Sequence, residues 1–368
     1  MGGITFKNAV SGFPAYLHDQ LGFPQEGKAR NRPHIALAIK GSVAEATDCG
    51  QMRPIRVPAE LLAFASTQYG LVTGAQCDEH GLRRGTRAAL VANGSWSKVA
   101  RDVFDVSAEP AKYPATDWSH RRNAVMALLA TGPESIAVGA SALALLGVQG
   151  LPPTSKAAVA VARGRSARPR FGAPLHQFDV HGDVVMAEGR WRVADPRWAL
   201  AQVVPEVSRS HAVSLMDSIQ NLQILSEAGL SASHGIARGR RGVDRTHKWW
   251  SLSDGRAESP LETRVRLECR DFHIPADVLQ FPVEAHDGRV IGYGDLAWDL
   301  GAGKWLVAEA DGVEVHGAPD ALFRDRWRAN EFAALGVHIV RFTWRDLAPP
   351  GRVAAVISRQ LLQLRHAS

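Results

Sequence analysis

The most informative part of this chain lies between Ser259 and Leu347. It reads SPLETRVRL at 259–267, GDLAW at 294–298, WLVAEADGVEVHG at 305–317 and RDRWRANEFAALGVHIVRFTWRDL at 324–347. Two apolar, strand-like segments within it each reach an acid, Asp295 and Glu309. Carboxylates presented side by side from adjacent strands are the oxygen ligands that a hard cation such as Mg²⁺ binds together with a phosphate. The stretch therefore predicts a site for metal-assisted phosphodiester chemistry.

The spacing of the acids indicates how they would meet. Glu309 and Asp311 differ by two residues, so they share one face if the strand extends that far. Asp295, from the neighbouring strand, would join them, and these three carboxylates are the predicted ligands of Mg²⁺, for which Mn²⁺ could substitute. Such a metal would lower the pKa of a bound water and neutralise charge on the phosphate. His316 is a candidate for proton transfer because an ordinary histidine titrates near neutrality.

The same stretch predicts an order of elements, α-β-β-β-α-β-α. Ser259 is the expected N-cap of a helix that ends near Asp271, with Glu262 at the third helical position in a capping box. Later elements are expected as strands at 280–284, 290–298, 305–310 and 337–342, and helices at 320–335 and 352–364. Glu262 is explained equally well by capping alone, and Asp311 followed by Gly312 also fits a simple turn. Asp325 and Arg328 are most simply an exposed i,i+3 ion pair.

Residues 58–110 have a different pattern. Three short helices, the second with Thr73 as its N-cap, are followed by a ribbon of two short strands, which predicts a winged helix-turn-helix. No acid occurs from Gly81 to Arg101, so positive charge would lie on the recognition helix and wing, where the phosphates of double-stranded DNA would be contacted. The alternative is a small helical subdomain with a solvated basic face. The basic residues of this stretch are Arg83, Arg84, Arg87, Lys98 and Arg101.

Composition limits the class of protein. The 368 residues carry a net charge of +6, with 45% hydrophobic and 22% charged residues, which is typical of a soluble globular protein of two to three domains. The three cysteines form no CxxC motif, which argues against a disulfide framework or zinc ribbon and favours the reducing cytoplasm. The apolar runs are too short to span a bilayer, so we expect no membrane association.

Residues 111–257 show no catalytic constellation. Two apolar helices joined by a Gly-Pro break, a strand entering a basic loop, and one amphipathic helix over 211–230 predict a mixed α/β connector. Its basic residues either lie along a nucleic acid or are solvated, and the sequence favours neither. They are Arg163, Arg165, Arg168 and Arg170 in one loop, and Arg238, Arg240, Arg241, Arg245 and Lys248 in another.

Residues 258–368 resemble the very-short-patch-repair (Vsr-like) branch of the PD-(D/E)xK nucleases. The resemblance rests on Glu262 in SPLE, Asp295 in GDLAW, EADG at 309–312, His316, the D-x-x-R-x-N run at 325–330 and VRFTWRDL at 340–347. The segments YGLVTGAQ (69–76) and GSWSKVARDVFDV (94–106) resemble, more loosely, the DNA-binding domain of AbiEi-type antitoxins of type IV toxin–antitoxin systems. The first resemblance implies a catalytic set of Glu262, Asp295, Glu309, Asp311 and His316.

One departure from the family pattern affects the general base. PD-(D/E)xK nucleases have lysine two residues after the second acid, and here that residue is Asp311. Vsr-like members are similar to this chain in having an acid-Gly pair followed by histidine. The resemblance thus implies that His316 or Arg341 takes over the electrostatic role of the lysine, or else that the site is inactive.

Together these observations predict an α+β multidomain protein. The expected parts are a poorly patterned extension (1–57), a winged helix (58–110), a mixed α/β connector (111–257) and a restriction-endonuclease-like α/β domain (258–368). The first function hypothesis is a Mg²⁺-dependent DNA endonuclease in repair, defence or mobile-element control. The alternative is a DNA-binding regulator or antitoxin-like protein with a silent nuclease fold, with a toxin or a repair or defence protein as candidate partner. RNA processing is a weaker third, because the narrow major groove of A-form RNA does not admit a winged helix.

Overall fold

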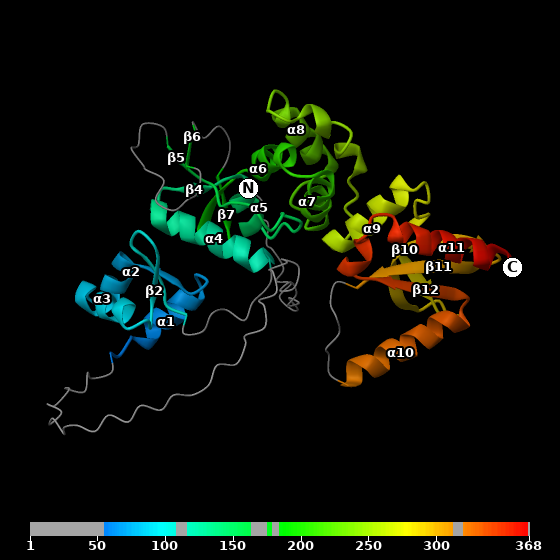
Figure 1. Ribbon diagram of the computed structural model, residues 1–368, viewed down its shortest axis with the longest axis horizontal. Helices are drawn as coiled ribbons and strands as arrows, with labels where there is room; N and C mark the ends of the chain where they lie inside the picture. The colour runs from blue at the N-terminus through cyan, green and yellow to red at the C-terminus, as the bar shows by residue number, and fades with distance from the viewer. Residues whose placement is uncertain (1–54, 108–115, 163–174, 179–183, 312–318, 367–368) are drawn as a thin grey trace, which may run out of the picture. The chain divides into compact units, whose positions relative to one another are not determined.

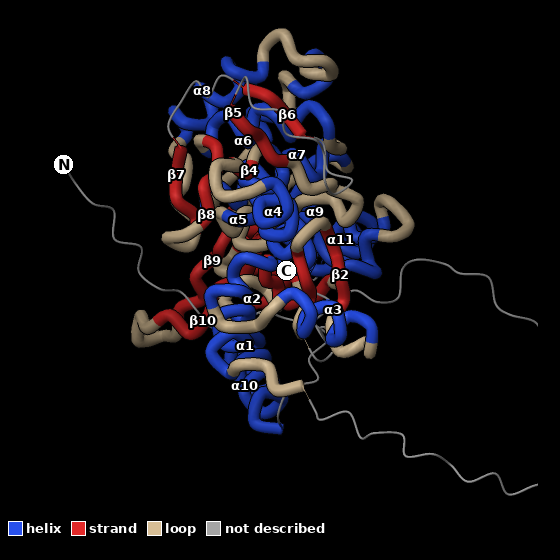
Figure 2. The backbone as a smooth tube through the Cα atoms, turned by 90° about the vertical axis from the view of Figure 1, so that its left-hand side faces the viewer, coloured by secondary structure: helices blue, strands red, loops and turns tan. Residues whose placement is uncertain are grey.

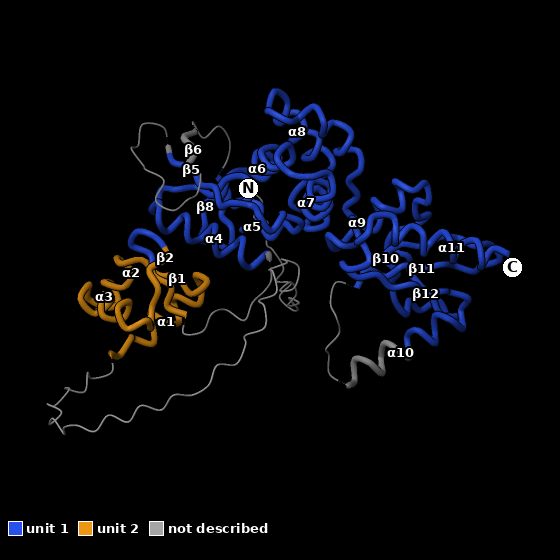
Figure 3. Tube along the Cα trace, viewed as in Figure 1, with its two compact units in different colours: residues 1–16, 100–103, 113–368 blue, residues 17–99, 104–112 orange. Residues whose placement is uncertain are grey.

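This computed structural model describes residues 55–107, 116–162, 175–178, 184–311 and 319–366 (Figure 1). The described residues fall into two compact units, one containing 55–99 and 104–107 and the other containing 100–103 and the described residues from 116 onward (Figure 3). Helices and strands are interspersed along the chain (Figure 2), so it is a mixed α/β protein, as the sequence predicts. None of the helices in these ranges has the length and apolarity needed to cross a membrane.

Residues 55–107 form three helices and a three-stranded sheet in the order β1-β3-β2. Thr73 caps the second helix as predicted, because its Oγ1 accepts a hydrogen bond from the Gln76 N–H (3.2 Å) and the Gln76 side chain accepts one from the Thr73 N–H (2.9 Å). Leu61, Leu90 and Trp96 are buried at the centre of this small core. The elements are α1 (Ala59–Ser66), β1 (Leu71–Thr73), α2 (Gly74–Glu79), α3 (Arg84–Ala92), β2 (Ser97–Ala100) and β3 (Val103–Asp105).

The middle region contains a five-stranded sheet in the order β6-β5-β4-β8-β7 and several packed helices. The chain enters α6 through Asp195, whose carboxylate accepts a hydrogen bond from the Arg197 N–H at the helix start (2.8 Å). The elements are α4 (Thr116–Thr131), β4 (Ile136–Ala137), α5 (Gly139–Leu145), β5 (Val159–Ala162), β6 (Leu175–Phe178), β7 (Val184–Ala187), β8 (Trp191–Ala194), α6 (Pro196–Val203), α7 (Arg209–Asn221) and α8 (Glu227–Ala237).

The single amphipathic helix expected over 211–230 is wrong. The structure has two helices there, α7 and α8, separated by a turn in which Gln223 adopts a left-handed backbone conformation (φ 57°). Ser226 then caps α8, because its hydroxyl accepts a hydrogen bond from the Gly229 N–H (3.3 Å). The apolar pattern continues across this break, so the periodicity of the sequence does not reveal where α7 ends. Residues 212–217 and Ile219 are all buried, so α7 lies inside the core rather than on its surface.

The C-terminal region follows the predicted order of elements. Its sheet has the order β12-β11-β10-β9, with an antiparallel meander from β9 to β11 and β12 parallel to β11. Parallel neighbours need a crossover connection, and α10 lies within that connection. The elements are α9 (Pro260–Asp271), β9 (Val278–Glu284), β10 (Val290–Gly301), β11 (Lys304–Ala310), α10 (Pro319–Ala334), β12 (Val337–Phe342) and α11 (Arg352–His366).

Helices cover both faces of this sheet (Figure 1). Leu261 of α9 and Ile357 of α11 share one apolar cluster with Leu296 of β10, whereas Phe332 of α10 packs on the other face with Val307 of β11. A Cβ at Gly294 would overlap the Val307 side chain, so the close approach of β10 to β11 just before Asp295 requires glycine.

A buried ion pair joins α9 to the middle region. Asp217 of α7 is 1% exposed, and its carboxylate accepts hydrogen bonds from Arg266 Nη2 (2.6 Å) and Thr263 Oγ1 (2.8 Å), both on α9. The backbone N–H of Asp254 donates a further bond to it (2.8 Å). Because every donor is fixed by secondary structure or a short turn, this network sets the position of the helix that carries Glu262.

Candidate active site

Asp295 lies where the ladder between β10 and β11 ends. The last paired residues are Leu296 and Ala308, and beyond them the Asp295 carboxylate accepts a hydrogen bond from the Ala310 N–H (2.7 Å). A side chain thus takes the place of a backbone acceptor, which satisfies the Ala310 N–H and holds Asp295 beside the C-terminal end of β11. Asp295 therefore lies next to the residue that follows Glu309 on the neighbouring strand.

Glu309 is the most enclosed acid of the site. It is 4% exposed, and its Oε2 accepts a hydrogen bond from Arg341 Nε (2.8 Å), the residue opposite it on β12. Arg328 Nη2 of α10 lies 2.9 Å from Oε1, but this contact lacks hydrogen-bond geometry, so Oε1 is buried without a hydrogen-bond partner among the described residues. Two arginines therefore compensate the charge of Glu309 in the structure.

This contact corrects the interpretation of Arg328 as half of an exposed surface pair. The side chain is only 32% exposed, and it reaches Glu309 across the sheet face covered by α10. Its guanidinium also lies over the ring of Phe332 (5.5 Å), one turn further along α10, and Phe332 is fully buried against the sheet. An i,i+4 relation between an arginine and an apolar residue was the sequence signal that could have placed Arg328 on the inner face.

Glu262 contributes from α9. The Ser259 hydroxyl accepts a hydrogen bond from the Glu262 N–H (3.2 Å), so Ser259 is the N-cap as predicted. The reciprocal half of the capping box differs, because Glu262 Oε2 accepts from the Glu258 N–H (2.9 Å) and from Gln280 Nε2 (3.0 Å). Glu262 is 8% exposed, and burial is the main cause that raises its pKa. The carboxylate therefore does more than cap its helix, since it also ties α9 to β9.

These acids share one electrostatic environment. Burial, followed by the negative charge of Glu262, raises the pKa of Asp295 to about 7. Glu309 and Asp311 add smaller contributions in the same direction, and the hydrogen bond from Ala310 opposes them. Acids from α9, from β11 and from the residue after β11 thus act on the carboxyl group of Asp295 in β10, and mutual repulsion of this kind is typical of functional carboxylate clusters.

Asp311 follows directly after β11. Its N–H donates to the Phe342 carbonyl (2.8 Å), which extends the pairing with β12 by one residue, and its carboxylate lies 3.6 Å from Arg341 Nε. Glu309 and Asp311 therefore both lie within reach of Arg341, in keeping with the shared face predicted for them. His316 lies outside the described residues.

The chemistry of this cluster fits a hard divalent cation, because all its donors are carboxylate oxygens and they repel one another. Among the described residues, however, no three His, Cys, Asp or Glu side chains are grouped closely enough to hold a metal ion. Glu309 is held by Arg328 and Arg341 instead. Asp295, Glu309 and Asp311 are the residues that would hold Mg²⁺, and the arginines on Glu309 compete with it.

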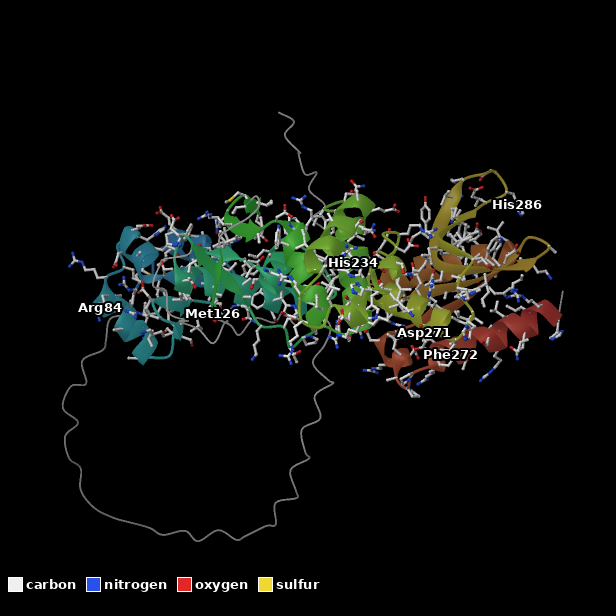
Figure 4. All side chains as sticks on the ribbon, turned by 90° about the horizontal axis from the view of Figure 1, so that it is seen from above. Arg84, Met126, His234, Asp271, Phe272 and His286 are labelled. Carbon is white, nitrogen blue, oxygen red and sulfur yellow. The ribbon has the colours of Figure 1, made fainter. Side chains whose placement is uncertain are left out.

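The predicted DNA-contacting residues divide into two groups. Arg83 and Arg84 at the start of α3, and Lys98 and Arg101 on the β2–β3 hairpin, are exposed. The position of Arg84 is marked in Figure 4. An exposed arginine at the N-terminal end of a helix is available to contact phosphate groups.

Arg87 is a correction to that set. It is 6% exposed, forms an ion pair with Asp78 of α2 and donates a hydrogen bond from Nη1 to the Leu82 carbonyl (2.7 Å). The stretch from Gly81 to Arg101 holds no acid, but Asp78 lies three residues before it and folds back onto α3. Arg87 therefore stabilises the packing of α2 against α3 and is not available to a nucleic acid.

Comparison with known proteins places the chain in a family. No family model matches it. It is 32% identical over 202 residues to Uncharacterized protein Rv2248 of Mycobacterium tuberculosis (strain ATCC 25618 / H37Rv), covering 54% of this chain and 72% of the relative. The same figures hold for Uncharacterized protein MT2308 of strain CDC 1551 / Oshkosh. The chain belongs to the family of these two mycobacterial proteins. Their names state no activity, so the function of the site has to be argued from its own geometry.

Proposed function

We propose that this protein is a DNA-binding endonuclease, with a PD-(D/E)xK nuclease domain at residues 258–368 and a winged helix at 58–110. The observation that carries the proposal is the set of Glu262, Asp295 and Glu309. These acids come from α9, β10 and β11 of an α-β-β-β-α-β order, and the first and third both act on the pKa of the second. An ordinary structural core has no reason to gather carboxylates that repel one another.

The residues of the chain have distinct roles in this proposal. Asp295, Glu309 and Asp311 face the scissile phosphate, and Glu262 raises the proton affinity of Asp295 from behind. A divalent cation bound here would supply charge neutralisation for the phosphate and a more acidic water. Arg341 contacts both Glu309 and Asp311 and stands where it can stabilise an anionic oxygen in place of the family lysine.

The DNA-binding part of the proposal rests on residues 55–107. Their element order, with α2 and α3 followed by the β2–β3 hairpin, supports a winged helix in which α3 is the recognition helix. The exposed cations of α3 and the hairpin would contact phosphates, and the binding they supply should weaken steeply with salt.

Plasmid cleavage tests the nuclease. Supercoiled plasmid is incubated with the protein in Mg²⁺, Mn²⁺ or EDTA, beside Glu309→Gln and the control Glu284→Gln. Glu284 is an exposed glutamate of β9, so its substitution changes the net charge equally without touching the site. We expect metal-dependent nicking or linearisation by the wild type and the control, and its loss in Glu309→Gln. Equal cleavage by Glu309→Gln would refute the assignment.

A second function has specific support. Asp311 stands at the position where PD-(D/E)xK nucleases have lysine, and Glu309 is held by two arginines rather than left open to a metal. Both observations favour a DNA-binding regulator built on a silent nuclease fold. Its signature would be a salt-dependent mobility shift in EDTA together with no cleavage in any metal.

A further inference from the structure

A cavity of about 350 Å³ lies between α7, α8 and the segment that follows Trp249, away from the carboxylate cluster. A volume of this order accommodates a small planar ligand. Neither the acids of the candidate active site nor the exposed cations of α3 line it, so the proposed function leaves this cavity unused. Its lining includes Gln220, Glu227, Ser231, His234, Trp250 and Ser253.

Two aromatic side chains form part of the cavity wall. The rings of His234 and Trp250 stack almost in parallel, with their centroids 5.0 Å apart and an interplanar angle of 15°. A hydrogen bond of 2.8 Å between His234 Nε2 and His247 Nδ1 holds the imidazole in place. The position of His234 on α8 is marked in Figure 4. A fixed aromatic pair offers a planar ligand a stacking surface with little loss of side-chain freedom on binding.

Polar groups suited to the edge of a heteroaromatic ring lie beside that surface. Gln220 Oε1 accepts a hydrogen bond from Ser253 Oγ (2.7 Å), which orients the amide and leaves its Nε2 without a hydrogen-bond acceptor among the described residues. The Gln220 amide, with the Ser231 hydroxyl and the Glu227 carboxylate, provides donors and acceptors of the kind that the edge of a nucleobase requires.

The loop beside the cavity, rather than the cavity lining, favours a polyanion. The loop RGRRGVDRTHK at 238–248 carries five basic residues against one acid, Asp244. Arg238, Arg241 and Lys248 are exposed. Burial, followed by the charges of His247 and Arg238, lowers the pKa of His234, so these two loop residues lie near the cavity wall. Arg245 is used internally, because it donates hydrogen bonds to the Pro205 and Val207 carbonyls. Phosphates bound along this loop would bring bases to the cavity mouth.

We propose that this cavity binds a single unstacked nucleobase, presented by a DNA strand whose phosphates lie on the 238–248 loop. The proposal rests on the proposed function as far as DNA binding is concerned, and it is independent of cleavage. The base would stack against the His234–Trp250 pair and be held at its edge by Gln220. DNA with an unpaired base would be preferred because extrusion from a perfect duplex costs unstacking and unpairing energy.

Binding of three short duplexes in EDTA tests the proposal. One duplex is fully paired, the second carries a single unpaired base, and the third carries an abasic residue at the same unpaired position. We expect the unpaired base to improve affinity at least about fivefold over both other duplexes, since stacking of one base on an aromatic side chain supplies that much. Equal affinities for the unpaired base and the abasic residue would overturn the proposal, because bending alone would then explain the binding.

Two adjacent small residues of α8 supply the matched variants. Ser231 and Ala232 are both exposed, but only Ser231 lines the cavity. Ser231→Phe should fill the cavity and abolish the preference for the unpaired base, while Ala232→Phe should retain it. Gln220→Met, which keeps an unbranched side chain of similar length but removes the amide, should reduce the preference. Retention of the full preference in Ser231→Phe would exclude this cavity as the site.

Free nucleoside monophosphates identify the source of the base. One outcome is that a free nucleotide binds saturably to the wild type but not to Ser231→Phe, while the duplexes show no preference for the unpaired base. That result would show that the cavity binds a nucleobase, but that the base comes from a free nucleotide and not from DNA. If the protein binds none of the three duplexes, the proposed DNA-binding function is refuted. Binding of free nucleotides would then be the only test of whether the cavity is a nucleobase site. Binding of all duplexes alike, with no nucleotide binding, would reject the cavity proposal and leave DNA binding intact.

Discussion

The carboxylate of Asp295 accepts a hydrogen bond from the backbone N–H of Ala310 (2.7 Å), so a side chain of β10 closes the end of the β10–β11 ladder. The same carboxylate lies in the field of Glu262, Glu309 and Asp311. Asp295 therefore combines a stabilising hydrogen bond with an unfavourable negative charge. A substitution that keeps the hydrogen-bond acceptor but removes the charge separates these two effects.

The first prediction concerns the stability of Asp295→Asn in EDTA. The folded-state pKa of about 7 lies above the ordinary value of 3.8, so folding favours the protonated form. Stability is therefore lost as the pH rises from about 4 to about 7, and the full cost is present above pH 7. Because asparagine keeps an acceptor for the Ala310 N–H without the charge, the variant should be more stable than the wild type at pH 8 by an amount on the order of 2 to 4 kcal/mol.

Urea unfolding of both proteins at pH 4 and pH 8 measures this difference. At pH 4 the two proteins should have nearly equal free energies of unfolding. A variant that is less stable than the wild type at pH 8 would show that the hydrogen bond, and not the repulsion, dominates at Asp295.

The second prediction concerns divalent cations. A cation that binds the acid cluster relieves the repulsion and stabilises the folded state by mass action. At pH 8, millimolar Mg²⁺ or Mn²⁺ should raise the Tm of the wild type and of Glu284→Gln, and should have little effect on Asp295→Asn or Glu309→Gln. Thermal unfolding in metal and in EDTA measures the shift without reference to cleavage. The same metal-induced shift in all four proteins would indicate binding elsewhere.

The third prediction separates the two arginines of α3. Arg84→Ala should weaken a mobility shift on duplex DNA and reduce the slope of log K against log salt by about one, with the Tm unchanged. Arg87→Met should lower the stability of residues 55–107 instead, because it leaves Asp78 unpaired and removes a bond to the Leu82 carbonyl. Arg56→Ala, an exposed charge outside the basic stretch, controls for net charge. Equal binding by wild type and Arg84→Ala would exclude α3 as a phosphate-binding helix.

The fourth prediction concerns the ion pair that positions α9. Arg266→Met leaves the buried Asp217 carboxylate without its cation and should reduce the free energy of unfolding by about 3 kcal/mol or more. The same substitution at Arg256, whose side chain is 59% exposed beside Asp254, should cost less than about 1 kcal/mol. Urea unfolding at pH 7 compares them. Similar losses in the two variants would show that the buried pair has no special weight.

Much of the local structure was predictable. The cap at Thr73, the N-cap at Ser259 and the strand at 337–342 depend on residues within one turn or on a two-residue period, and each agrees with the structure. The break between α7 and α8 was missed because apolar residues continue across it and only the backbone of Gln223 marks the turn. The position of Glu309 near the end of β11 also followed from the pattern, whereas Asp295 lies within β10, which continues to Gly301.

The partners of the charged residues were not predictable in the same way. Arg87 meets Asp78, and Arg328 reaches Glu309, because helices pack back onto earlier elements. The pKa of Asp295 is raised by burial and then by the charge of Glu262, which lies 33 residues earlier in the chain. In the C-terminal region the order of elements and the N-cap could be read from the chain, because they depend on short-range periodicity and local hydrogen bonds. Which charges are paired, which are buried and where a cavity forms became known from the fold alone, because these depend on distances between residues that are far apart along the chain.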